Sequence, residues 1–185
     1  MTIMKNGITF VLLMLLVFTS CKQTSYKAEI TTIDSLLVEL DTLDLIHRRI
    51  DTTDFATFRK TFTDNISYVQ QAYTEGKDTM PKNVAMLMSE YRVLKKPAKG
   101  LHKKYTKTAE ELKFAKRQLA DLRHDLQNNL LDSVFVEEML IEERQAVKSV
   151  SSSLEELKIS SDFIEKKREE LEPRIDSLIQ VIKEK

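Results

Sequence analysis

Three histidines, one cysteine and 29 Asp and Glu residues are the side chains of this chain that could serve acid–base or metal chemistry. Asp44 and His47, like Asp121 and His124, stand three residues apart, which places a carboxylate and an imidazole on one helix face. Helical bundles that hold two metal ions use the related Glu-x-x-His spacing. In the antiparallel bundle argued for below, the two pairs lie about 20 Å apart along the axis at 1.5 Å per residue. We therefore expect no metal site and assign His47 to the seam of its helix, as a polar residue that fixes the register.

Paired glutamates are the other candidates for acid–base work. They occur as adjacent residues, and adjacent residues on a helix do not face each other, so two such carboxylates cannot converge on one bond. These pairs are Glu110-Glu111, Glu142-Glu143, Glu155-Glu156 and Glu169-Glu170. The chain also has no Gly-rich phosphate loop and no GxSxG or HExxH motif. We predict no catalytic residue, no cofactor and no small-molecule substrate.

Cys21 is the single cysteine, and it ends an apolar stretch near the start of the chain. Lys5 precedes a run from Ile8 to Phe18, which has the length of a signal-peptide core and falls short of the roughly 20 residues that cross a bilayer. The small residues Thr19 and Ser20 then stand directly before the cysteine. A lone cysteine in an exported chain forms no internal disulfide, so another role is expected for it.

The stretch Phe18-Thr19-Ser20-Cys21 resembles the lipobox of bacterial lipoproteins, although Phe18 stands where that family usually has Leu. The resemblance implies cleavage between Ser20 and Cys21 and attachment of acyl chains to Cys21, which would hold the protein on a membrane. Lys22 follows the cysteine where lipoproteins retained at the inner membrane of enteric bacteria carry Asp, which implies the outer membrane. An ordinary secretory signal or an uncleaved anchor is the alternative.

Composition predicts an all-α protein. The chain contains three Gly and three Pro, too few for the frequent turns of a sheet protein, and 31% of its residues are charged. Its 29 Lys and Arg balance its 29 Asp and Glu, so no net charge draws it to nucleic acid, and the export signal also argues against that partner. We expect a signal peptide at 1–20, a lipidated cysteine and short tether at 21–27, and a helical domain at 28–185.

Apolar residues at heptad spacing mark three long helical runs, at about 28–75, 83–128 and 133–183. The seam of the first run shifts register at 51–54, so this run forms either one helix or two. Pro97 and Gly100 predict a kink or break within 96–100, and Pro173 predicts a kink or an opened end in the third run. Asp132 or Ser133 is expected to cap the third run.

Short connections make such runs antiparallel neighbours. The fold expected is therefore an elongated antiparallel three-helix bundle with coiled-coil heptads. A four-helix version, or helices completed by a second copy or a partner, is the alternative.

A basic segment lies at 92–107 and contains no acidic residue. It could dock an acidic partner, a phosphorylated glycan or anionic lipid, or it could simply lie against acidic neighbours. Its seven cations are Arg92, Lys95, Lys96, Lys99, Lys103, Lys104 and Lys107.

Methionines and aromatic residues are expected to gather at the turn that lies away from the membrane. They either close the core there or offer an adaptable apolar surface to a partner. They are Met80, Met86, Met88, Phe55, Phe58, Phe62 and Tyr91. The function expected is a lipid-anchored scaffold or adaptor of the cell envelope that binds a protein partner or itself. A client- or toxin-binding module, such as a periplasmic chaperone or an inhibitor, is the alternative.

Overall fold

The computed structural model describes residues 25–50, 53–76 and 79–184. Within these ranges the chain forms five helices and no strand, which confirms the all-α fold. The helices are α2 (Lys27–Arg48), α3 (Thr53–Glu75), α4 (Lys82–Arg92), α5 (Lys95–Gln127) and α6 (Ser133–Lys183).

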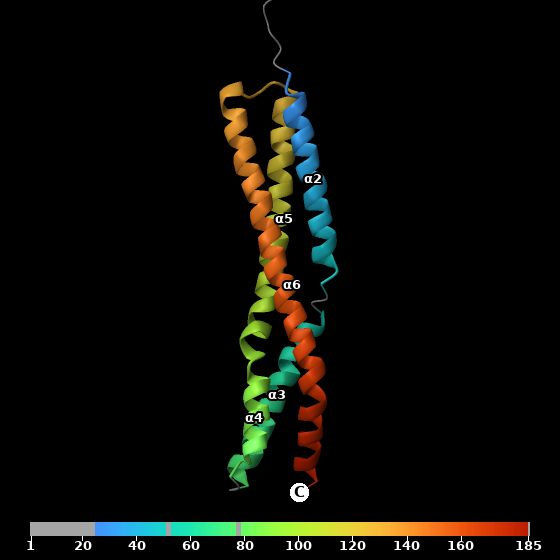
Figure 1. The fold of residues 1–185 in the computed structure, drawn as a ribbon, viewed down its shortest axis with the longest axis vertical. Coiled ribbons are helices and arrows are strands. Elements are labelled where there is room, and N and C mark those ends of the chain that lie inside the picture. The colour runs from blue at the N-terminus through green and yellow to red at the C-terminus, as the bar shows by residue number, and fades with distance from the viewer. Residues whose placement is uncertain (1–24, 51–52, 77–78, 185) are drawn as a thin grey trace, which may run out of the picture.

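The helices form three antiparallel limbs in an elongated bundle (Figure 1). α2 and α3 follow each other along the first limb, α4 and α5 return along the second, and α6 alone makes the third. One end, here called the near end, holds the start of α2 and the α5–α6 turn, whereas the far end holds the α3–α4 connection and the end of α6 (Figure 1). The expected antiparallel bundle is confirmed, with the first run divided into two helices.

The break in the second limb lies at Val93 and Leu94, so the prediction that placed it within 96–100 was wrong. Pro97 is the third residue of α5, where a backbone N–H has no partner within the helix in any case. The chain adjusts ahead of the proline, since the N–H groups of Val93 and Leu94 donate to carbonyls only three residues back, at 3.2 and 3.1 Å. Gly100 lies inside α5.

Pro173 does not end α6, so the last segment of the third run does not open as we had allowed. Leu171 and Ile175, on either side of the proline, are fully buried. Packing of these two side chains against the other limbs holds the helix together where the proline removes one backbone hydrogen bond.

The α5–α6 turn closes the near end with two complementary caps. Asn129 adopts a left-handed conformation (φ 53°), and the Leu130 N–H donates to the Asp125 carbonyl at 2.9 Å, which satisfies the end of α5. Asp132 caps α6 as predicted, accepting from the Val134 N–H at 3.2 Å. The Tyr26 hydroxyl donates to the Leu131 carbonyl at 3.1 Å, which ties the start of the first limb to this turn.

The bundle contains two apolar cores in series. The near core consists of Tyr26, Ile33, Leu40, Leu112, Ala115, Leu119, Leu122, Leu126, Val136, Leu140, Val147 and Val150. The far core consists of Phe58, Phe62, Val69, Val84, Met88, Tyr91, Leu94, Ala98, Leu101, Leu154, Leu157, Ile164, Leu171 and Ile175. His47 and Thr108 are the buried polar residues found in the described chain, and neither belongs to either core.

Candidate functional site

The residues of the predicted lipidation site, Ser20 and Cys21, lie outside the described part of the chain. The description begins at Ser25, four residues after Cys21. Tyr26 is buried against the near core and hydrogen-bonded to the α5–α6 turn. The described chain therefore begins at the near end of the bundle.

The seven cations of the basic segment are all exposed, but they do not form one patch. Lys104 lies 3.7 Å from Glu156 of α6, and its ammonium also donates to the Ser160 hydroxyl at 3.4 Å. Lys107 pairs with Glu111 of its own helix at 3.0 Å. For this part of the segment, pairing with acidic neighbours accounts for the charge.

Arg92, Lys95 and Lys99 line a groove between α3 and the α4–α5 junction. Their spacing of three and then four residues places them on one helix face. We call this the basic groove; its volume is about 620 Å³. Its lining residues are Arg59, Phe62, Thr63, Ile66, Ser67, Gln70, Arg92, Lys95, Ala98 and Lys99. Four of these are cationic and none is acidic.

The floor of the basic groove is apolar. Phe62 and Ala98 are buried members of the far core, and Ile66 packs against that core. The Phe62 ring lies 4.7 Å from the ring of Tyr91, centroid to centroid, which supports the floor from below. Within the described chain no ion pair joins the cations Arg59, Arg92, Lys95 or Lys99 to an acidic side chain. The arrangement suits a ligand with an apolar face and negative charges at its edges.

Most of the predicted methionine and aromatic cluster is core. Phe58, Phe62, Met88 and Tyr91 are buried, while Phe55 and Met80 pack against the same core. Met86 differs, because 57% of its surface is exposed.

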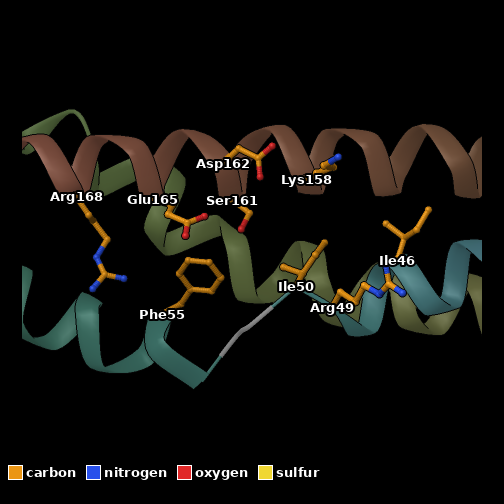
Figure 2. Close-up of a pocket in the computed structure, with 9 residues that line it drawn as sticks. All are labelled: Ile46, Arg49, Ile50, Phe55, Lys158, Ser161, Asp162, Glu165 and Arg168. Atoms are coloured by element: carbon orange, nitrogen blue, oxygen red, sulfur yellow. The ribbon is translucent and has the colours of Figure 1, made fainter.

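A second hollow lies where the first limb breaks, facing α6 (Figure 2). Its volume is about 500 Å³. Three apolar residues and Arg49 of the first limb form one wall, and polar and charged residues of α6 form the other. The lining residues are Ile46, Arg49, Ile50, Phe55, Lys158, Ser161, Asp162, Glu165 and Arg168.

Two polar residues of α6 explain why this hollow is not filled by the core. Ser161 and Arg168 occupy seam positions of α6 where the heptad pattern calls for apolar side chains. The Arg168 guanidinium lies over the Phe58 ring at 4.5 Å and donates to Glu172 at 3.0 Å. Arg168 is therefore engaged with the protein itself, and we assign this hollow to imperfect packing.

The two Asp–His pairs lie in different parts of the bundle, and only His47 is buried. His47 is buried, its Nε2 lies 3.0 Å from the Tyr105 carbonyl oxygen, and its ring stacks on that of Tyr105 at 4.0 Å. His124 is exposed near the end of α5, where its carbonyl accepts from the Asn128 side chain. No cluster of three or more His, Cys, Asp or Glu that could hold a metal occurs in the residues described.

A cluster of charges between α2 and α5 was not predicted from the sequence. The Lys116 ammonium lies 2.8 Å from both Asp41 and Asp44, and Arg48 also pairs with Asp44 at 2.8 Å. Hydrogen bonds from Lys116 and then from Arg48 lower the pKa of Asp44. Because Asp44 and Lys116 stand 72 residues apart in sequence, only the packing of α2 on α5 brings them together.

Within the part of the chain that the structure describes, no helix has the combination of length and apolar character needed to cross a membrane. Comparisons of the chain with protein-family models, with curated proteins and with solved structures found no match.

Proposed function

We propose that this protein is a lipid-anchored scaffold or adaptor of the bacterial cell envelope, which docks a protein partner in the basic groove. The groove carries the proposal, because it combines an apolar floor, four cations and no carboxylate among its lining residues. Its volume lies within the range usual for binding sites.

The anchor part of the proposal rests on the resemblance of Phe18-Thr19-Ser20-Cys21 to a lipobox. Cleavage before Cys21 and acylation of that cysteine would hold the chain on the membrane, with the outer membrane favoured by Lys22. The four residues from Cys21 to Ser25 span at most about 14 Å, so the near end would stay close to the bilayer and the basic groove would face away from it.

Binding explains the groove better than catalysis does. Its hydroxyl groups belong to Thr63 and Ser67, and no lining residue is an imidazole or a carboxylate that could activate them. The cations sit on three different helices, α3, α4 and α5, around an apolar floor, which is how an amphipathic acidic segment of a partner would be recognised.

The experiment places a photo-crosslinking amino acid at Ser67, in the basic groove, in full-length protein in living cells. Ser149 of α6 is the matched control, because it is also an exposed serine but lies beside the near core. We expect one recurring protein adduct at Ser67 that is absent at Ser149.

Charge reversal completes the test. Lys95→Glu with Lys99→Glu should abolish the Ser67 adduct, whereas Lys103→Glu, outside the groove, should leave it. Equal adducts at Ser67 and Ser149, or none at Ser67, would reject the docking site. The mass of the purified N-terminal peptide reports separately whether Cys21 carries acyl chains.

A client-binding module is the second candidate, favoured by the exposed Met86 on α4. A photo-crosslinking probe at Met86 that captures many unrelated proteins would support the client-binding hypothesis, since flexible methionine surfaces accept varied partners.

A further inference from the structure

Three large apolar side chains are exposed together at the near end. Leu130 is 64% exposed, Val134 75% and Phe135 56%, although the three fall within six residues of sequence. Leu130 belongs to the α5–α6 turn, and Val134 and Phe135 belong to the first turn of α6. We call these three residues the apolar tip.

The apolar tip lies on the side of the molecule where the described chain begins (Figure 1). Five residues of chain from Cys21 to Tyr26 span at most about 18 Å. The hydrogen bond from the Tyr26 hydroxyl to the Leu131 carbonyl then holds the turn against the start of α2. An acylated Cys21 would therefore keep the apolar tip within a short distance of the membrane.

Charge near the apolar tip does not attract it to a membrane, so a contact there has to come from the apolar side chains. Residues 125–138 include Asp125, Asp132, Glu137 and Glu138 but no Lys or Arg. Such a segment gains nothing from anionic headgroups, which attract basic segments. Leu, Val and Phe side chains are the ones that partition into the boundary between headgroups and acyl chains.

We infer that the apolar tip inserts into the bilayer beside the lipid anchor, as a second membrane contact that holds the bundle upright. This inference rests on the lipid anchor proposed above. Several acyl chains on Cys21 would already retain the protein, so the contribution of a protein contact beside the anchor is orientation. A free anchor would let the bundle tilt on its tether, whereas an inserted tip sets which way the basic groove faces.

The test places a photo-crosslinking amino acid at Phe135 in full-length protein in intact cells. Phe114 is the matched control, because it is a phenylalanine on α5 with a similar exposure of 62%. It lies about 20 Å from the end of α5 at 1.5 Å per residue. A second probe at Val134 guards against a local disturbance at Phe135. The acylation of Cys21 is read from the mass of the same purified protein.

We expect phospholipid adducts at Phe135 and Val134, at least tenfold more abundant than at Phe114, on protein whose Cys21 is acylated. Acylated protein with no lipid adduct at Phe135, or with equal yields at Phe114, would overturn the inference and leave the anchor intact. Self-adducts at Phe135 without lipid would also overturn it, in favour of contact between two copies. Protein without acyl chains on Cys21 would overturn both the lipid anchor and this inference, and would leave the test of the basic groove unaffected.

Discussion

The near and far halves of the bundle follow the same three-limb plan but are filled differently. The near core is aliphatic apart from Tyr26, and its helices α2, α5 and α6 run unbroken through it. The far core contains three aromatic residues and Met88, and its second limb is divided between α4 and α5. Regular heptads give a uniform rod, whereas aromatic residues and breaks leave room for grooves.

The two halves also differ in whether their cations have acidic partners on another helix. In the near half, Lys116 and Arg123 of α5 pair with Asp41, Asp44 and Asp34 of α2. In the far half, the cations that line the basic groove have no such partners in the described chain. The near half therefore joins two of its limbs by ion pairs, whereas the four cations of the basic groove have no acidic partner in the described chain.

A polar layer lies between the two cores, and Leu43 of α2 packs against both of them. His47 and Thr108 are buried at the level where α2 ends, and the His47 ring stacks on Tyr105. Only α5 and α6 continue across this level, so the halves share two of the three limbs (Figure 1). We expect each half to open as a separate cooperative unit.

The largest effects should come from matched core truncations in the two halves. Leu119 of the near core and Leu171 of the far core are both fully buried. Leu119→Ala and Leu171→Ala should each cost about 2–5 kcal/mol of stability, because each removes buried methyl groups and leaves a cavity. Native-state hydrogen exchange should speed up in α2 for the first variant and in α3 and α4 for the second.

Leu45→Ala is the control for these truncations, because Leu45 is exposed on α2. It should change stability by less than about 0.5 kcal/mol. Faster exchange along the whole bundle in both core variants would show that the halves open together.

Replacing Pro173 should raise the stability of the far half alone, and so change the difference in stability between the two halves. A proline inside a helix costs about 3 kcal/mol, and Pro173→Ala would restore an N–H that can donate to the Glu169 carbonyl. We expect a gain of about 1–3 kcal/mol, measured by denaturant unfolding and seen as slower exchange at the end of α6. Pro81→Ala is the control, since Pro81 precedes the first helical residue of α4 and costs that helix no hydrogen bond. An unchanged stability in Pro173→Ala would mean that the far half already compensates for the proline.

Heptad spacing predicted most of the fold, because burial along a helix follows the repeat. It placed Leu119, Leu171 and even the polar His47 on the seams where the structure has them. The break before Pro97 was misplaced because a proline disturbs the turn that precedes it, and local spacing does not reveal where the chain yields.

The candidate site was only half visible in sequence. The basic segment included Arg92, Lys95 and Lys99, which line the groove, but the opposite wall of the groove comes from Arg59 and Phe62 of α3. No local pattern links these two segments. The packing of the limbs decides which lysines have an acidic partner. The sequence therefore could not show that Lys104 is paired with Glu156 whereas Lys99 lines the basic groove.

Replacing His47 should destabilise the boundary between the two halves, at a smaller cost in stability than the core truncations. His47→Ala loses the contact with the Tyr105 carbonyl and the stacked ring, and we expect a cost of about 1–3 kcal/mol. His47→Leu should instead join the two cores, so that α2 and α3 exchange more nearly together. His124→Ala is the control, because that histidine is exposed and should matter little. Separate exchange of the halves in His47→Leu would show that the helix breaks alone divide the bundle.

The smallest effect should come from Asp44, whose contribution depends on pH. Hydrogen bonds from Lys116 and Arg48 lower the pKa of Asp44 in the folded state. The ionised Asp44 carboxylate therefore stabilises the fold at pH values above its ordinary pKa of about 4. This contribution disappears as the pH falls through the lowered pKa of the folded state. Asp44→Asn should therefore cost up to about 1 kcal/mol at pH 7 and nothing at the acid end, as measured by urea unfolding across that range. Glu170→Gln is the control, since Lys167 also lowers the pKa of Glu170 but this pair lies on the exposed surface of one helix, where solvent screens it. A constant difference between wild type and Asp44→Asn at every pH would show that Asp44 acts through packing, and the near half would then owe its stability to its aliphatic core alone.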